Sequence, residues 1–198
     1  MTFNKFAMTS GACALALALA GCGSTNTTTY SESPAEADGT GAMADADPAA
    51  AAAAPVTASL KTADGKDVGT VTATPGDGMI MVAVNAMGMT AGDHGIHIRT
   101  VGKCDGPKFE SAGSHWNPTG AKHGLSNPEG SHGGDMPNLT IAGDGTGKLE
   151  YSIKEAVFAD LQDADGAAVV IHAKADDQMT DPSGDSGDRF ACGVFAKG

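Results

Sequence analysis

The sequence is poor in aromatic residues, in basic residues and in long apolar runs, and each shortage excludes a class of protein. Only 5% of the 198 residues are aromatic whereas 28 are glycine, which favours many short strands and turns over long helices. Lysine and arginine number 12 against 24 acidic residues, a net charge of −12. This argues against a nucleic-acid partner, which requires a basic face, but it leaves an anionic substrate open because steering depends on local charge.

The N-terminal segment has the features of an export signal. Lys5 is the single charge before the apolar run at residues 11–21, which is shorter than the roughly 20 residues needed to cross a bilayer. The run ends in Leu-Ala-Gly-Cys, which resembles a bacterial lipobox. Residues 1–22 are therefore expected to be a lipoprotein signal peptide, with Cys22 the lipid-modified first residue of a mature protein anchored at a cell-envelope membrane of the bacterial periplasm. The alternative is an ordinary signal peptide cut nearby, with Cys22 incidental.

Composition divides the remainder of the chain into a tether and a domain. Residues 23–56 are rich in alanine, proline and acidic residues, so they bury too little apolar surface to fold and are expected to be a disordered tether. Residues 57–198 are expected to form one domain. After export this domain retains two cysteines, Cys104 and Cys192, and an even pair in an oxidising compartment predicts a disulfide. Two free buried thiols are the alternative.

The domain is predicted to be all-β. Alternating apolar and polar residues predict strands at 57–62, 68–74, 79–85, 95–101, 148–153, 168–173 and 191–196. A short helical turn fits residues 155–162. Two long stretches, 104–139 and 176–189, are rich in Gly, Pro, Asp and Asn and lack a strand pattern, and loops of this length are commonly functional. The expected architecture is a β-sandwich or flattened barrel that carries two long functional loops.

The first long loop contains a set of residues that suits a metal ion. His115, His123, His132 and Asp135 follow the spacing H-x7-H-x8-H-x2-D, and three imidazoles with one carboxylate suit tetrahedral Zn²⁺. A solvated histidine-rich loop is the alternative. Two more histidines, at 97 and 172, lie in predicted strands, where a lone histidine is more often structural. Together with the loop set they form an imidazole-rich group without thiolate, which suits copper.

Six segments together resemble the copper/zinc superoxide dismutases, most of all their bacterial periplasmic branch. They read GMTAGDHGIH from residue 88, SAGSHWNP from 111, KHG from 122, HGGD from 132, VIHAKADD from 170 and GDRFACG from 187. The resemblance covers residues 58–198. It implies a Greek-key, immunoglobulin-like β-sandwich of the copper/zinc superoxide dismutase type and the conversion of superoxide to dioxygen and hydrogen peroxide.

The resemblance also implies a role for each matched residue. The copper ligands would be His97, His115 and His172, and the zinc ligands His115, His123, His132 and Asp135, with His115 bridging the two metals and taking part in catalysis. Asp176 would orient one imidazole of each site, and His94 would hold the metal loop through hydrogen bonds. Arg189 would bind the superoxide anion, and the Cys104–Cys192 disulfide would anchor the loop near Arg189. Members of this branch are often homodimers.

One position departs from the family pattern. The family's copper strand reads His-x-His, whereas this chain reads His97-Ile98-Arg99. Side chains two residues apart point to the same face of a strand, so Arg99 is expected to project toward the copper pocket or to swing out and pair with an acid. A guanidinium stays protonated and has no lone pair for a metal. We therefore expect zinc to bind, copper to bind weakly and dismutation to be impaired.

Two other functions remain open from the sequence. A non-catalytic, zinc-stabilised metal-binding lipoprotein would keep the same fold and the zinc ligands. A plain adhesive β-sandwich would need no metal at all.

Overall fold

The computed structural model describes residues 53–196 as an antiparallel β-structure. Its strands are β1 (Val56–Thr62), β2 (Asp67–Gly76), β3 (Met79–Ala86), β4 (Gly92–His94), β5 (Ile96–Arg99), β6 (Leu139–Ile141), β7 (Gly147–Lys154), β8 (Ala168–His172) and β9 (Arg189–Val194). Two short 3₁₀ helices, η1 (Glu110–Ala112) and η2 (Phe158–Gln162), interrupt the loops. Within the described residues no helix is long and apolar enough to cross a membrane. The predicted signal peptide, Cys22 and all of the tether except residues 53–56 lie outside the described residues.

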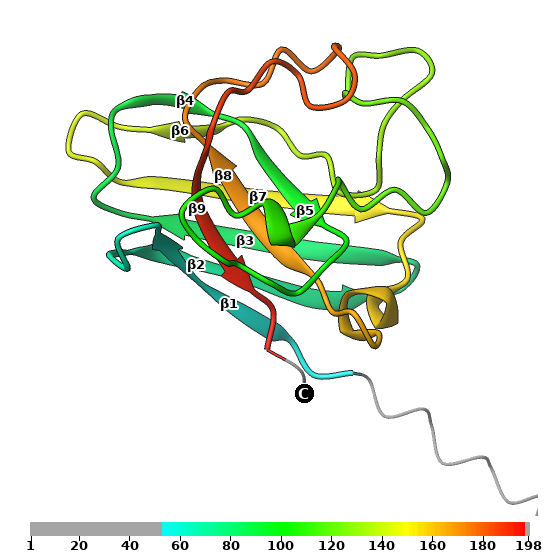
Figure 1. The fold of residues 1–198 in the computed structure, drawn as a ribbon. Coiled ribbons are helices and arrows are strands. Elements are labelled where there is room, and N and C mark those ends of the chain that lie inside the picture. The colour runs from blue at the N-terminus through cyan, green and yellow to red at the C-terminus, as the bar shows by residue number, and fades with distance from the viewer. Residues whose placement is uncertain (1–52, 197–198) are drawn as a thin grey trace, which may run out of the picture. The chain divides into compact units, whose positions relative to one another are not determined.

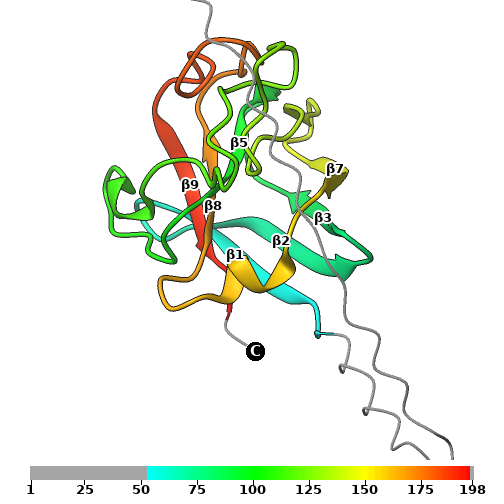
Figure 2. The same ribbon diagram turned by 90° about the vertical axis from the view of Figure 1, so that its right-hand side faces the viewer.

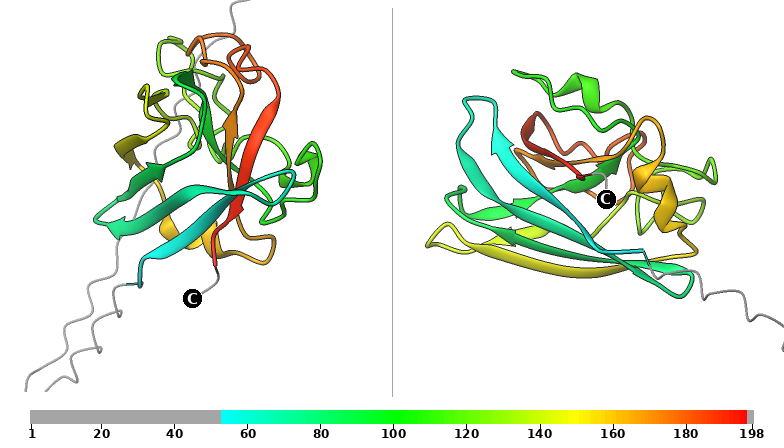
Figure 3. Two further views of the ribbon diagram at one scale, coloured as in Figure 1. Left: turned by 90° about the vertical axis from the view of Figure 1, so that its left-hand side faces the viewer. Right: turned by 90° about the horizontal axis from the view of Figure 1, so that it is seen from below.

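The nine strands form one sheet in the order β4-β6-β7-β3-β2-β1-β9-β8-β5. The edge strands β4 and β5 follow each other along the chain with only Gly95 between them, so the sheet curls into a nearly closed barrel. Figures 1 and 3 show the long strands β1, β2, β3 and β7 as one curved layer and β5, β8 and β9 as the layer opposite. The predicted all-β flattened barrel is confirmed.

All seven predicted strands are present, and two further strands were missed. These are β4 and β6, three residues each, which pair with one another. Neither is long enough to show a period of two in the sequence, so only their pairing defines them. The first strand also begins at Val56, one residue before the expected start of the domain.

The barrel core follows from alternation in the long strands. In β3 the buried residues Ile80, Val82, Val84 and Ala86 alternate with more exposed ones, as expected for a strand with one face on the core. By contrast, all residues of β5 and β8 are buried, because the outer face of this layer is also covered. There Ala168 and Val170 of β8 pack with Phe109, Ala112 and Cys192 beneath the first long loop.

The two long loops meet at one end of the barrel. Figures 1 and 2 show the loop before β6 and the loop before β9 gathered at the same end, beside β5 and β8. The first loop pairs with the free edge of β5: Ile98 donates from its backbone N to Gly134 O at 2.9 Å and accepts at its O from Trp116 N at 2.9 Å. A disulfide between Cys104 and Cys192 ties the start of this loop to β9. Histidine-bearing segments far apart in the sequence are thereby held over β5.

Candidate metal centre

Strand β5 turns two of its side chains toward the loops. Ile96 and Ile98 belong to the barrel core, so the alternation of a strand directs His97 and Arg99 to the opposite face. Both are buried there, at 0% and 3% exposure. The isolated bridges His97–Asp135 and Arg99–His115 show that the loop residues lie directly beside β5.

Three loop imidazoles and one carboxylate converge within metal-binding distance. The Oδ1 atom of Asp135 lies 2.9 Å from His115 Nδ1, 3.0 Å from His123 Nδ1 and 3.4 Å from His132 Nδ1, and the Nδ1 atoms of His132 and His115 are 3.2 Å apart. Ligands on tetrahedral zinc at 2.0–2.1 Å are separated by about 3.3–3.4 Å. These four distances are close to the ligand separations of tetrahedral Zn²⁺, and three imidazoles with one carboxylate are a donor set that suits zinc.

A second combination replaces His132 with His97. The ligand atoms of His97, His115, His123 and Asp135 lie within 4.8 Å of one another. The His97 side chain forms no ion pair with Asp135 and is bound instead to Asp176 Oδ2 at 2.6 Å, whereas His132 Nδ1 lies 3.4 Å from Asp135 Oδ1. We therefore assign the zinc-like site to the set that contains His132.

Asp176 connects the two groups of histidines. Its Oδ2 accepts from His97 Nε2 at 2.6 Å and its Oδ1 from His123 Nε2 at 3.0 Å, with all three side chains inaccessible to solvent. Nε2 therefore carries a proton in each ring, so in the neutral form of either ring Nδ1 is the lone-pair nitrogen available to a metal. Burial raises the pKa of the Asp176 carboxyl, but the bonds from His123 and His97 outweigh it and hold the pKa well below its usual range.

Burial and hydrogen bonding act against each other on the charged groups of the zinc-like site. Burial alone would raise the pKa of Asp135, yet the bonds from His115, His123 and the Gly124 backbone N hold it well below its usual range. Burial lowers the pKa of His123, but its bonds to Asp135 and Asp176 raise it to about 9. In the metal-free protein His123 is therefore protonated and donates to Asp135 and Asp176, and a metal would have to displace the proton on Nδ1.

The three histidines assigned to copper by resemblance lie side by side. The rings of His97 and His115 stack with centroids 4.0 Å apart, and the His172 ring lies 5.0 Å from that of His97. His97 Nδ1 and His115 Nε2 are buried without a hydrogen-bond partner, so both nitrogens are available to a metal ion. His172 donates from Nδ1 to Gly187 O at 2.9 Å, which leaves its Nε2 as an acceptor.

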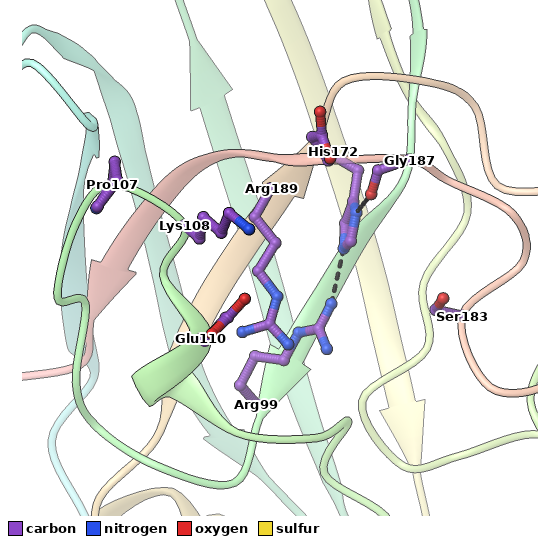
Figure 4. A pocket seen from close by; sticks show the side chains of 9 residues that line it. Arg99, Pro107, Lys108, Glu110, His172, Ser183, Gly187 and Arg189 are labelled. Carbon is purple, nitrogen blue, oxygen red and sulfur yellow. Dashed lines mark hydrogen bonds between the residues drawn. The ribbon is translucent and has the colours of Figure 1, made fainter.

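Arg99 donates a hydrogen bond to His172 Nε2. Its Nη2 lies 2.6 Å from His172 Nε2, as drawn in Figure 4, so of the two expected outcomes for Arg99 the side chain points into the pocket. Among the described residues no carboxylate lies within ion-pairing distance of it. Burial and the nearby Arg189 lower the Arg99 pKa to about 9, so the guanidinium is still charged at neutral pH. A metal ion bound to all three imidazoles does not fit unless Arg99 moves away.

The remaining predicted residues surround this pocket. His94 hydrogen-bonds the carbonyls of His172 at 2.8 Å and Thr90 at 2.9 Å, so it fastens β4 to the end of β8. Arg189 donates from Nη1 to Phe109 O and from Nη2 to Gly113 O. These carbonyls belong to the loop that the disulfide anchors, so the loop fixes the position of the Arg189 guanidinium.

Sequence reasoning missed two residues that support the site. Asn138 exchanges two hydrogen bonds with the Asp176 backbone, each 2.8 Å long. Asp181 accepts from the backbone N of His123 at 2.6 Å. Neither belongs to a pattern that singles it out, because each acts through backbone groups that only the folded loops bring within reach.

Comparison with known proteins agrees with the geometry. Residues 68–195 match the family model for copper/zinc superoxide dismutase. The chain belongs to the copper/zinc superoxide dismutase family. It is 40% identical over 146 residues to the copper–zinc superoxide dismutase of Caulobacter vibrioides, covering 70% of this chain and 84% of that protein.

Two solved structures are similar to this fold. A superoxide dismutase-like protein from Bacillus subtilis aligns with a TM-score of 0.67 and 35% identity, over 71% of this chain and 97% of that one. The copper/zinc superoxide dismutase from Brucella abortus aligns with a TM-score of 0.60 and 30% identity, over 72% and 99% of the two chains. Copper and zinc are the metals that the family name implies, and the His/Asp cluster is a site able to hold a metal.

Proposed function

We propose that this protein is a zinc-holding superoxide dismutase of the bacterial cell envelope whose dismutation is impaired by Arg99. The observation that carries the proposal is the contact of Arg99 Nη2 with His172 Nε2 at 2.6 Å, beside two unpartnered imidazole nitrogens of His97 and His115. A redox metal such as copper would supply the electron transfer for dismutation, and it is the component that this arrangement resists.

The rest of the site supports dismutase chemistry. Zinc would be held by His115, His123, His132 and Asp135, and Asp176 orients His97 relative to that site. His115 offers Nδ1 to the zinc-like cluster and Nε2 to the pocket, so its single ring joins the two. Arg189 lines the same pocket and presents a fixed positive charge to an anion such as superoxide.

Substitution Arg99→His tests the impairment. Two unit charges about 4 Å apart repel by roughly 4 kcal/mol at an effective dielectric of 20, so removing the guanidinium should raise copper affinity at least about a hundredfold. Copper and zinc content and superoxide consumption are measured after loading with both metals. Lys148→His is the matched control, since Lys148 is exposed on β7 and the change also exchanges a cation for histidine. Wild-type protein with full copper and full activity would refute the impairment.

A non-catalytic role is the second candidate, favoured by the same Arg99–His172 contact and by the likeness to a protein described only as superoxide dismutase-like. Under that reading Arg99→His restores copper binding, while the wild-type protein binds zinc, gains stability from it and shows no dismutation. Zinc removal without loss of thermal stability would instead favour a metal-independent adhesive domain.

The envelope location is proposed from the first 22 residues. We infer a lipid on Cys22, which would anchor the protein to a membrane facing the periplasm. Mass spectrometry of the mature N-terminal peptide should find acylated Cys22, and Cys22→Ser should release the protein from membranes. Light scattering of the domain decides whether it forms the homodimer common in this branch.

A further inference from the structure

The two arginines of this chain share one cavity. The sequence contains no others, at positions 99 and 189, and both line a cavity of about 540 Å³ together with Lys108, Glu110, His172 and Asp188. Figure 4 shows the two guanidinium groups pointing toward each other, although they come from β5 and from β9. Like charges placed side by side repel, so this arrangement costs free energy unless something offsets it.

No acid of the described residues forms a close ion pair with either guanidinium, although Asp135 attracts Arg99 and Glu110 attracts Arg189 from farther away. Among the described residues neither guanidinium has a carboxylate within 4.0 Å, although the chain carries 24 acidic residues. Glu110 and Asp188 line the cavity but are exposed. Arg99 itself is only 3% exposed and its Nε has no partner. A buried charge without a counter-ion is strongly unfavourable.

The donors of the two side chains are largely unused. Each guanidinium has five N–H groups. Arg99 makes one hydrogen bond, to His172, and Arg189 makes two, to backbone carbonyls that fix its position. Both side chains line the cavity together with Lys108, so donors other than the solvent-inaccessible Arg99 Nε are available to a bound anion.

We propose that Arg99 turns this cavity into a binding site for a small, stable oxyanion held between the guanidinium groups of Arg99 and Arg189. Planar guanidinium groups bind phosphate and carboxylate oxygens in pairs, and two of them at one site select an anion with several oxygens over a halide. His172 receives its hydrogen bond from Arg99, so it orients the guanidinium without binding the anion itself. The site lies where the family places copper, so anion and copper would compete for it.

Binding is tested with inorganic phosphate as the probe and acetate as a second arm. Zinc-loaded protein is titrated by calorimetry at constant ionic strength set with chloride, because general screening would affect all anions alike. Phosphate should bind more tightly than acetate and chloride should not compete. Arg99→Met, which keeps an unbranched side chain but removes the guanidinium, should weaken phosphate binding about tenfold to a hundredfold, the loss expected for hydrogen bonds to a charged group. Lys122→Met, which removes an exposed cation elsewhere, should leave it unchanged.

Chemical modification of the wild type keeps the test independent of how the variant folds. An arginine-selective dicarbonyl can react at only two positions in this chain, and phosphate should slow modification of both arginines, as read by peptide mass. Equal modification rates with phosphate and with chloride, or phosphate affinity unaffected by Arg99→Met in a folded variant, would overturn the proposal. The copper content and activity of Arg99→His are separate readouts, so the dismutase proposal stands or falls independently.

Discussion

Asp176 is the residue whose removal should show most clearly how the two histidine groups are coupled. In Asp176→Asn the remaining oxygen can occupy the Oδ1 position, where it accepts from His123 Nε2 at 3.0 Å and from Gln178 N at 2.6 Å. The new amide NH₂ then faces His97 Nε2, so two donors meet where a 2.6 Å hydrogen bond existed. The size of the side chain is unchanged, and the effect therefore comes from charge and hydrogen bonding alone.

The magnitude follows from the bonds that are lost. A hydrogen bond to a charged group contributes about 1.5–3 kcal/mol, and a buried donor left without an acceptor costs about 1–3 kcal/mol. Some relaxation of His97 offsets part of this, so we expect the free energy of unfolding to fall by about 2–4 kcal/mol. Zinc affinity should fall about tenfold or more, as for other residues that orient metal-binding imidazoles.

Urea unfolding of zinc-loaded protein and zinc competition with a chromogenic chelator measure the two effects. Asp67→Asn is the control, because its ion pair with Lys61 is exposed and such pairs contribute little. If Asp176→Asn unfolds within about 0.5 kcal/mol of the wild type and keeps its zinc affinity, Asp176 does not couple the two groups.

Three further predictions concern pH, backbone shape and the disulfide. Burial lowers the pKa of His115 to about 4 from 6.5, so metal-free protein loses stability as pH falls from 6.5 toward 4. The pKa of His123 is raised to about 9, so the stability that its protonation adds is complete below pH 6.5 and is lost as pH rises through 9. Urea titrations of the metal-free protein should therefore find the largest free energy of unfolding near pH 6.5. A free energy of unfolding that rises steadily to pH 9 would contradict this. Gly184→Ala should abolish zinc binding in the same chelator assay, because a Cβ at this position would lie 1.7 Å from Asp176 Oδ1. Gly120→Ala is the control, since Gly120 also has a positive φ but has open space around it. Equal zinc affinities of the two variants would show that the collision is relieved. Reducing the disulfide, which spans 88 residues, should lower the free energy of unfolding by about 4–5 kcal/mol, and an unchanged thermal transition would show that the loop is held without it.

The fold was largely predictable because its long strands carry their own pattern. Strands such as β3 alternate over eight residues, and that period exists in the sequence before any folding. The short strands β4 and β6 were not predictable, since their three residues gain strand geometry only by pairing with each other. The burial of both faces of β8 likewise depends on a loop that lies more than 50 residues earlier in the chain.

The sequence by itself determined which residues were candidates: six histidines, two arginines, Asp135, Asp176 and the Cys104–Cys192 pair, with His97 and Arg99 on one face of a strand. Only the tertiary structure decided where Arg99 went. Its hydrogen-bond partner His172 is 73 residues away, and the neighbouring guanidinium of Arg189 is on β9. Whether Arg99 paired with an acid or entered the pocket therefore depended on which groups the two loops brought to β5. Local sequence fixes the direction of a strand side chain, whereas the charges that it meets there are set by segments distant along the chain.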